Sequence, residues 1–273
     1  MKIEIKMNKC LEVEKSIIKK YRKEIWSKFI KAIKDYKLIS DNDRIAVCIS
    51  GGKDSFLLAK CMQELQRHGQ IKFELEFIIM NPGYEAKVLR HTKDNLELLN
   101  IEAHIFETPV FKIADTSESP CYLCAKMRRG YLYDYAKKLN CNKIALGHHM
   151  DDVVETILLN LLYNGAYSSM MPKLKSDNFE NIELIRPLYL IREKDIINFK
   201  NYNELEFIDC ACSVTKKNSG KRVEMKNLLI ELEKYNKDAI KSILTSTSNV
   251  NLNTIISYKK DRKNHNFLDD YDK

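Results

Sequence analysis

The stretch Arg44-Ile-Ala-Val-Cys-Ile-Ser-Gly-Gly-Lys-Asp-Ser55 joins a strand, a turn and the start of a helix. Apolar, β-branched residues fill its first half, which indicates a buried strand. Gly51 and Gly52 then permit a tight turn and let the backbone approach a ligand closely. The helix that follows presents unpaired backbone N–H groups and a positive dipole end, an arrangement that binds phosphate.

Two charged residues follow the glycines. Lys53 supplies a point charge for phosphate, and Asp54 can hold a metal ion or orient a nucleotide. The spacing is not that of Gly-x-x-x-x-Gly-Lys-Ser/Thr, which disfavours an ordinary P-loop NTPase. The motif instead resembles the pyrophosphate loop of the N-type ATP pyrophosphatases, which adenylate a substrate and release pyrophosphate; a purely structural glycine turn is the alternative. We expect catalytic roles for Lys53 and Asp54, in an ATP site formed by Ser50, Gly51, Gly52, Lys53, Asp54 and Ser55.

The chain has 273 residues and a net charge of +8, enough for one large α/β domain or two small ones. Residues 9–37 hold ten Lys or Arg and four acids, with apolar residues at helical spacing. This pattern predicts a long amphipathic helix whose basic face is either solvated or attracts a polyanion. No apolar run has the length of a membrane span and no leader is evident, so we expect a cytoplasmic protein whose eight cysteines are reduced.

Strand-like and helical segments alternate along the chain. Strands are expected at 44–49, 74–80, 103–107, 143–147 and 182–186, and helices at 54–67, 85–99, 124–139, 151–163 and 192–204. This alternation predicts an α/β fold, a parallel sheet with helices on both faces, of the Rossmann-like, adenine nucleotide alpha-hydrolase type. A basic helix precedes it, a helical extension follows from about 221, and residues 259–273 are expected to be frayed.

Ligands of such folds bind beyond the carboxyl ends of the strands. Three strand ends, 50–55, 81–84 and 147–152, should therefore face one crevice. In the last, Asp151 or Asp152 is expected to cap the next helix. Carboxylates there also suit Mg²⁺ on phosphates, and a histidine suits nucleotide contact or proton transfer. We assign to the ATP site the further residues Gly147, His148 and Asp152.

The cysteines form two clusters. Cys121 and Cys124 are two residues apart, and beside them lie the basic residues Lys126, Arg128 and Arg129, which we expect to contact RNA. Alone, this pair fits zinc, an iron–sulfur cluster or thiol redox chemistry. The second cluster, Cys210 and Cys212, makes a metal centre the better interpretation. Two others, Cys48 and Cys61, are expected in the core.

Together, the motifs at 50–55, 121–130, 145–152 and 186–195 resemble, in order and spacing, those of the TtcA-type tRNA 2-thiocytidine synthetases over residues 15–236. The resemblance implies an ATP- and Mg²⁺-dependent tRNA sulfurtransferase that modifies a cytidine of the anticodon loop. It also implies a 4Fe-4S cluster on Cys121, Cys124 and Cys212, with Cys210 as the alternative third ligand. The implied partners are tRNA and a sulfur donor, a cysteine desulfurase, and a homodimer is left open. No membrane partner is expected.

The implied organisation is a helical segment at 1–40, a catalytic domain binding ATP and the cluster at 41–215, and a helical extension with a polar tail at 216–273. Two departures from the family pattern stand out. Cys210-Ala-Cys212 replaces a Cys-x-x-Cys, and Met150 stands where an arginine is usual. Alternative functions are a related enzyme, such as a tRNA 2-thiouridine synthetase or a lysidine-type ligase, or a metal-containing RNA-binding protein without catalysis.

Overall fold

A computed structural model of the chain describes residues 2–114, 120–207, 220–269 and 271, with the backbone alone at 2–7 and 120–122. Its centre is a sheet of the strand order β3-β2-β1-β4-β6-β5. Five strands are parallel: β1 (Arg44–Cys48), β2 (Glu74–Asn81), β3 (Ala103–Glu107), β4 (Lys143–Ala145) and β6 (Glu183–Ile185). The sixth, β5 (Lys173–Lys175), pairs antiparallel with β6 at the edge.

The five parallel strands confirm the strands expected from the sequence. The strand β5 was missed because its three residues, Lys-Leu-Lys, are largely exposed and show no apolar run. Successive strands are added on one side from β1 to β3 and on the other side from β4 onward, so the strand order reverses between the adjacent parallel strands β1 and β4. Ligands of open α/β sheets bind at such a point. The register pairs Val47 with Ala145, which brings the loops after both strands side by side.

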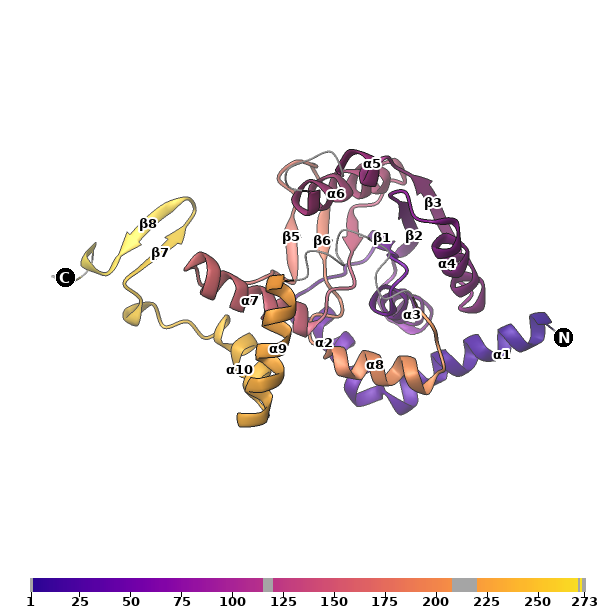
Figure 1. The fold of residues 1–273 in the computed structure, drawn as a ribbon, viewed down its shortest axis with the longest axis horizontal. Helices are drawn as coiled ribbons and strands as arrows, with labels where there is room; N and C mark the ends of the chain where they lie inside the picture. The colour runs from indigo at the N-terminus through magenta and orange to yellow at the C-terminus, as the bar shows by residue number, and fades with distance from the viewer. Residues whose placement is uncertain (1, 115–119, 208–219, 270, 272–273) are drawn as a thin grey trace.

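Helices cover both faces of this sheet, as expected (Figure 1). Side chains of β1 alternate between them: Ile45 and Val47 face a core shared with α3, α4 and α8, whereas Ala46 and Cys48 face α6. These helices and their neighbours are α3 (Lys53–His68), α4 (Ala86–Leu98), α5 (Val110–Ala114), α6 (Pro120–Lys138), α7 (Met150–Asn164) and α8 (Glu193–Tyr202).

The expected N-terminal helix is an almost continuous run of α1 (Lys2–Lys15), two π-helical turns, η1 (Ser16–Lys20) and η2 (Arg22–Trp26), and α2 (Ser27–Asp35). Its apolar stripe is buried: Ile17, Ile25 and Phe29 belong to the same core as α3. A charged contact adds to this packing, because Glu14 pairs with the buried Lys60 of α3 at 2.6 Å. The basic residues lie mostly on the outer side.

Beyond the sheet, α9 (Gly220–Tyr235) and α10 (Ala239–Ser246) pack on α7 through Met225, Leu229, Ile240 and Leu244. A short turn, η3 (Leu252–Thr254), leads to a hairpin of β7 (Ser257–Lys260) and β8 (Lys263–Asn266), followed by η4 (Phe267–Asp269). The expectation of a frayed tail from residue 259 is therefore wrong for 259–269. Among the described helices, none is long and apolar enough to cross a membrane.

Candidate functional site

The loop between β1 and α3 is closed on itself by Ser55. Its hydroxyl accepts a hydrogen bond from the Ser50 N–H at 3.1 Å and donates one to the Gly52 carbonyl at 2.8 Å. Gly51 has φ of +92°, a backbone conformation that residues other than glycine rarely adopt. The loop therefore directs the first turn of α3 toward the carboxyl end of the sheet, as the sequence predicted.

Gly147, at the end of β4, is required by close packing against this loop. A Cβ atom there would lie 3.1 Å from both the Asp54 carbonyl carbon and the Ser55 nitrogen. These are backbone atoms, which cannot rotate away. The two glycine-containing strand ends predicted to meet are therefore in direct contact.

The carboxylate of Asp54 is only partly paired. Its Oδ2 lies 3.2 Å from Lys53 Nζ, while Oδ1 is buried with no hydrogen-bond partner among the described residues. His149 Nε2 lies 3.8 Å from Oδ1, beyond hydrogen-bond distance. Burial raises the pKa of Asp54, against the lowering effect of His149 and Lys53. A buried oxygen without a partner is expensive, and an external cation or donor would satisfy it.

The cap of α7 differs from the expected one. The N-cap is His149, whose Nδ1 accepts from the Asp152 N–H, while Asp152 Oδ2 accepts from the His149 N–H at 2.9 Å. The prediction that Asp151 or Asp152 is the N-cap is therefore wrong, because both lie within the first helical turn. Asp151 instead pairs with Arg192 at 3.1 Å and accepts from the Glu193 N–H at 2.6 Å, which fastens α7 to α8.

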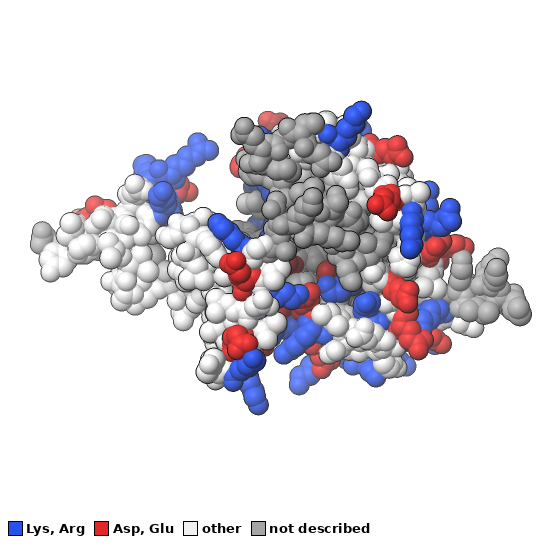
Figure 2. All heavy atoms as spheres, viewed as in Figure 1, with Lys and Arg blue, Asp and Glu red and all other residues white. Residues whose placement is uncertain are grey.

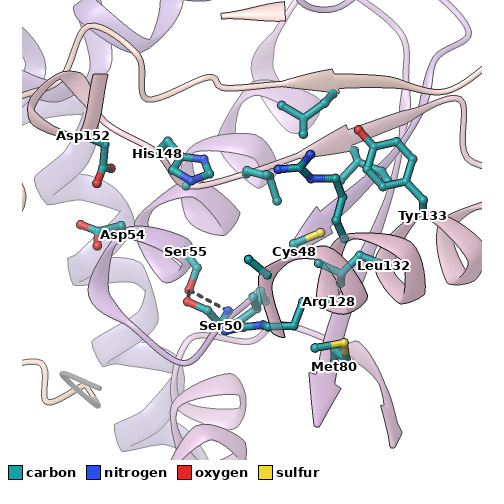
Figure 3. Close-up of a pocket in the computed structure, with 17 residues that line it drawn as sticks. Cys48, Ser50, Asp54, Ser55, Met80, Arg128, Leu132, Tyr133, His148 and Asp152 are labelled. Carbon is teal, nitrogen blue, oxygen red and sulfur yellow. Dashed lines mark hydrogen bonds between the residues drawn. The ribbon is translucent and has the colours of Figure 1, made fainter. Parts of the chain in front are cut away.

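A cavity of about 440 Å³ lies between α6 and the carboxyl ends of the strands (Figure 3). Its volume is in the range of small-molecule sites. Predicted ATP-site residues line it together, namely Ser50, Asp54, Ser55, Gly147, His148 and Asp152. Residues that sequence reasoning missed form an apolar wall: Cys48, Ile49, Met80, Leu132, Tyr133, Ile144, Leu146 and Leu184. The sequence indicated only that these residues belong to, or lie next to, apolar strands and a helix. It did not indicate that they face a cavity.

His148 has an unusual environment within this cavity. Its Nδ1 is buried without a hydrogen-bond partner among the described residues. Burial lowers the pKa of His148 to about 4, despite the opposing charge of Asp152. The imidazole is therefore neutral at pH 7 and can accept or donate a hydrogen bond to a ligand.

The predicted RNA contacts divide into two groups. Arg128 and Arg129 of α6 line the same cavity as Asp54, so their charges are available to a ligand inside it (Figure 3 labels Arg128). Lys126 is exposed and is not among the lining residues. The predicted strand end 81–84 is not among the lining residues, although Met80 just before it is. The Asn81 side chain instead holds the turn, accepting hydrogen bonds from the N–H groups of Gly83 and Tyr84.

A smaller cavity of about 210 Å³ adjoins the first and shares Asp54 and Asp152 with it. Lys53 lies here, where Glu193 of α8 pairs with it at 3.1 Å. The C-terminal helix α9 adds two cations that the sequence did not assign to the site: Lys226, 2.6 Å from Glu193, and Arg222, 3.8 Å from Asp152. The last lining acid, Glu155, is buried; burial and the charge of Asp152 raise its pKa to about 7.

The cysteine pair lies near this site. Cys121 and Cys124 are in the first turns of α6, with two residues between them, so positions i and i+3 lie on one side of the helix. Cys124 is half-buried, and the adjacent Ala125 lines the larger cavity. Cys210 and Cys212 lie outside the described residues, within which no group of three metal-ligating side chains is found.

The described residues that flank those cysteines in the sequence pack in two different places. Phe207 stacks on Phe56 in the core beside α3, with ring centroids 5.0 Å apart, whereas Arg222 reaches Asp152 at the smaller cavity. Cysteine thiolates are the donors that hold an iron–sulfur cluster. The core positions expected for Cys48 and Cys61 are confirmed, and burial raises the pKa of Cys48 to about 12.

A mostly parallel sheet with a glycine loop, a neutral histidine and two carboxylates where its strand order reverses defines an ATP-binding protein of the pyrophosphate-loop class. A family model described as the PP-loop domain matches residues 21–222. Similar proteins named tRNA-cytidine(32) 2-sulfurtransferase include one from Geobacter sulfurreducens, 39% identical over 81% of this chain and 87% of its own length. Another, from Francisella tularensis, is 37% identical over 87% of this chain and 90% of its own length. The chain belongs to the PP-loop family of tRNA-cytidine(32) 2-sulfurtransferases, as its motifs indicated.

A solved structure shares the fold. The U34-tRNA thiolase NcsA from Methanococcus maripaludis, determined with its [4Fe-4S] cluster, superposes with a TM-score of 0.66. The two are 24% identical over 82% of this chain and 77% of that one. This likeness confirms the predicted α/β architecture.

Proposed function

We propose that the chain uses ATP to replace the C2 oxygen of cytidine 32 in tRNA with sulfur. The observation that carries this proposal is the shared cavity. Asp54, after the glycine loop, and Ala125, next to Cys124, both line it. A base inside this cavity would meet both an ATP-activating loop and a thiol pair. The names of the relatives support tRNA cytidine 32 as the substrate.

The first step activates the base. The C2 oxygen attacks the α-phosphorus of ATP, a new P–O bond forms, and the bond to the pyrophosphate breaks with its electron pair leaving on pyrophosphate. Lys53 and the N–H groups at the start of α3 offset the charge that develops there. His148, neutral and with no hydrogen-bond partner on Nδ1 in the described part of the chain, is placed to hydrogen-bond the nucleotide or the base.

Asp54 and Asp152 would hold Mg²⁺. Both line the two adjoining cavities, and Asp54 Oδ1 has no hydrogen-bond partner among the described residues, so the donor set fits a hard cation. When bound, the ion neutralises phosphate charge. With only two protein carboxylates, phosphate oxygens and water would complete its coordination.

In the second step sulfur displaces the activated oxygen. Sulfide-level sulfur attacks C2, a C–S bond forms, and the C2–O bond breaks with AMP leaving. We propose Cys121, Cys124 and Cys212, or Cys210 in place of the last, as the ligands of a 4Fe-4S cluster. When bound, such a cluster supplies an iron site with affinity for sulfide. The i, i+3 spacing of Cys121 and Cys124 in α6 supports it, as does the cluster in NcsA.

The partners follow from this chemistry. We propose tRNA as the macromolecular substrate, with Lys126, Arg128 and Arg129 near its phosphates. A cysteine desulfurase is the proposed source of sulfur, a homodimer the proposed assembly and the cytoplasm the proposed compartment. Separate measurements test each, beginning with the reaction itself.

The test is thiolation in vitro. The anaerobically reconstituted protein is incubated with ATP, Mg²⁺, sulfide and an unmodified tRNA transcript, and the nucleosides are analysed by mass spectrometry. We expect 2-thiocytidine with cytidine at position 32 and none when that base is changed to uridine. Thiouridine in the second transcript, or no thiolated base in either, would contradict the proposal.

A further inference from the structure

The C-terminal hairpin of β7 and β8 projects from the body of the molecule beyond α10 (Figure 1). Most of its residues are exposed, and only Tyr258 and His265 are half-buried. An isolated two-stranded hairpin is marginally stable in water. Its sequence gives it a use other than packing.

The tip of this hairpin concentrates positive charge. Between 259 and 263 the chain holds one acid, Asp261, and four bases: Lys259, Lys260, Arg262 and Lys263. In Figure 2 the tip is the blue patch at the upper left of the molecule. A basic projection of this kind attracts a polyanion.

The pairing within the tip is unfavourable without a ligand. Lys260 and Lys263 are directly opposed across the strands, and like charges in that position destabilise a hairpin. The two residues between them, Asp261 and Arg262, have φ of +50° and +64°. Such turns usually contain Gly or Asn. A bound anion would offset the repulsion that this arrangement creates.

The same face of the hairpin carries an aromatic platform. Tyr258 and His265 pair across the strands and stack with ring centroids 4.8 Å apart and planes at 11°. Both lie two residues from the opposed lysines, so the platform and the ammonium groups share one face. Stacked rings beside cations are the features with which proteins hold unpaired nucleotides.

We infer that this hairpin is a nucleic-acid-binding arm, which holds the sugar–phosphate backbone of tRNA through Lys260, Arg262 and Lys263 and stacks a base on Tyr258 and His265. The inference rests on the proposed function for the identity of the nucleic acid. A cavity of about 440 Å³ is of the size that holds small molecules. Most of a tRNA therefore lies outside it and needs contacts elsewhere on the protein.

The test compares two variants with equal loss of charge. K260Q/R262Q/K263Q removes three cations from the arm, and K87Q/R90Q/K93Q removes three from α4, at the other end of the molecule (Figure 1). Affinity for a labelled tRNA transcript is measured by fluorescence anisotropy over a salt series. We expect the arm variant to bind at least about tenfold more weakly, with a salt slope shallower by about two. The α4 variant should stay within about twofold of the unchanged protein.

Equal weakening in both variants would overturn the inference, because total charge alone would then explain binding. Unchanged affinity in the arm variant would overturn it as well. Sedimentation distinguishes a second copy of the chain as the true partner: loss of self-association with intact tRNA binding assigns the arm to a protein interface instead. Y258A tests the platform separately and should weaken binding without changing the salt slope. If the unchanged protein binds tRNA but fails to thiolate it, the proposed function fails while the arm stands.

Discussion

Lys53 and Glu193 form a salt bridge of 3.1 Å that fastens the pyrophosphate loop to α8. The second oxygen of Glu193 accepts from Lys226 of α9 at 2.6 Å, so one carboxylate holds two cations of the smaller cavity. Burial opposes ionisation of Glu193, but the hydrogen bond from Lys226 and the charge of Lys53 outweigh it and lower its pKa to about 2. Glu193 is therefore an anion at neutral pH and positions the cation expected to meet the phosphates.

Replacing Glu193 with glutamine should lower kcat/KM for tRNA-dependent pyrophosphate release by about tenfold or more. The neutral amide would leave Lys53 free to pair only with Asp54 and so draw it away from the phosphates; tenfold corresponds to about 1.4 kcal/mol of lost transition-state stabilisation. E231Q is the matched control, since Glu231 pairs with the exposed Lys234 on the outside of α9. A loss of similar size in both variants would argue against a positioning role.

Asp54→Ala should abolish pyrophosphate release while the protein stays folded. We propose that the carboxylate acts where charge develops, and its Oδ1 has no hydrogen-bond partner to lose among the described residues. Because burial raises its pKa above that of the unfolded chain, the ionised form opposes folding at neutral pH. We therefore expect an unchanged or higher Tm together with lost activity. Full activity in the folded variant would remove the loop from the mechanism.

Gly147→Ala should impair both activity and stability. The new Cβ would lie 3.1 Å from backbone atoms of Asp54 and Ser55 and displace the loop, at about 1–3 kcal/mol. Gly130→Ala, on α6, is the control: nothing lies within 4 Å of its Cβ, and alanine favours a helix by about 0.5–1 kcal/mol. Chemical denaturation should show a lower free energy of unfolding for Gly147→Ala and a higher one for Gly130→Ala. Pyrophosphate release should fall only in Gly147→Ala. An active, stable Gly147→Ala protein would contradict the close packing described.

Glu14→Gln should destabilise the fold by about 3–5 kcal/mol at pH 7, because it leaves Lys60 buried without its anion. Burial alone would raise the pKa of Glu14, but hydrogen bonds from Arg67 and Lys60 lower it to about 2. A lowered carboxyl pKa contributes stability that is present above about 4.5 and lost as pH falls toward 2. The unchanged protein and Glu14→Gln should therefore differ less in their free energy of unfolding, measured by urea denaturation, as the pH falls from 4.5 to 2.

The exposed Glu12, on the same helix, provides the control for that measurement. E12Q should change stability by less than about 0.5 kcal/mol at any of these pH values. A difference for Glu14 that stays constant with pH would show that packing, and not charge, holds the N-terminal helix.

The sequence predicted the parts of this molecule whose signal is local. Apolar runs located the parallel strands, and the glycine loop located the cavity, because chain order alone brings the ends of β1 and β4 together. The contributions of Glu193, Arg222 and Lys226 depend on how α8 and α9 pack, which no local pattern encodes. His149 took the capping position because its neighbours' carboxylates fall inside the first turn. The hairpin was missed because its strands are polar and exposed.

Cluster ligation remains a prediction, and it separates two neighbouring cysteines. Cys121 and Cys124 share one side of α6, so both thiolates can reach one cluster. The third thiolate is expected from Cys212, because the second cysteine of the family's Cys-x-x-Cys motif aligns best with this position. Cys210 would then remain as a nearby thiol. Anaerobic reconstitution with iron and sulfide should give a brown protein with broad visible absorption. C212A should lose that absorption and C210A should keep it, with C141A, a buried cysteine, as the control. The reverse pattern would assign the ligand to Cys210, and stoichiometric zinc without iron would remove the cluster altogether.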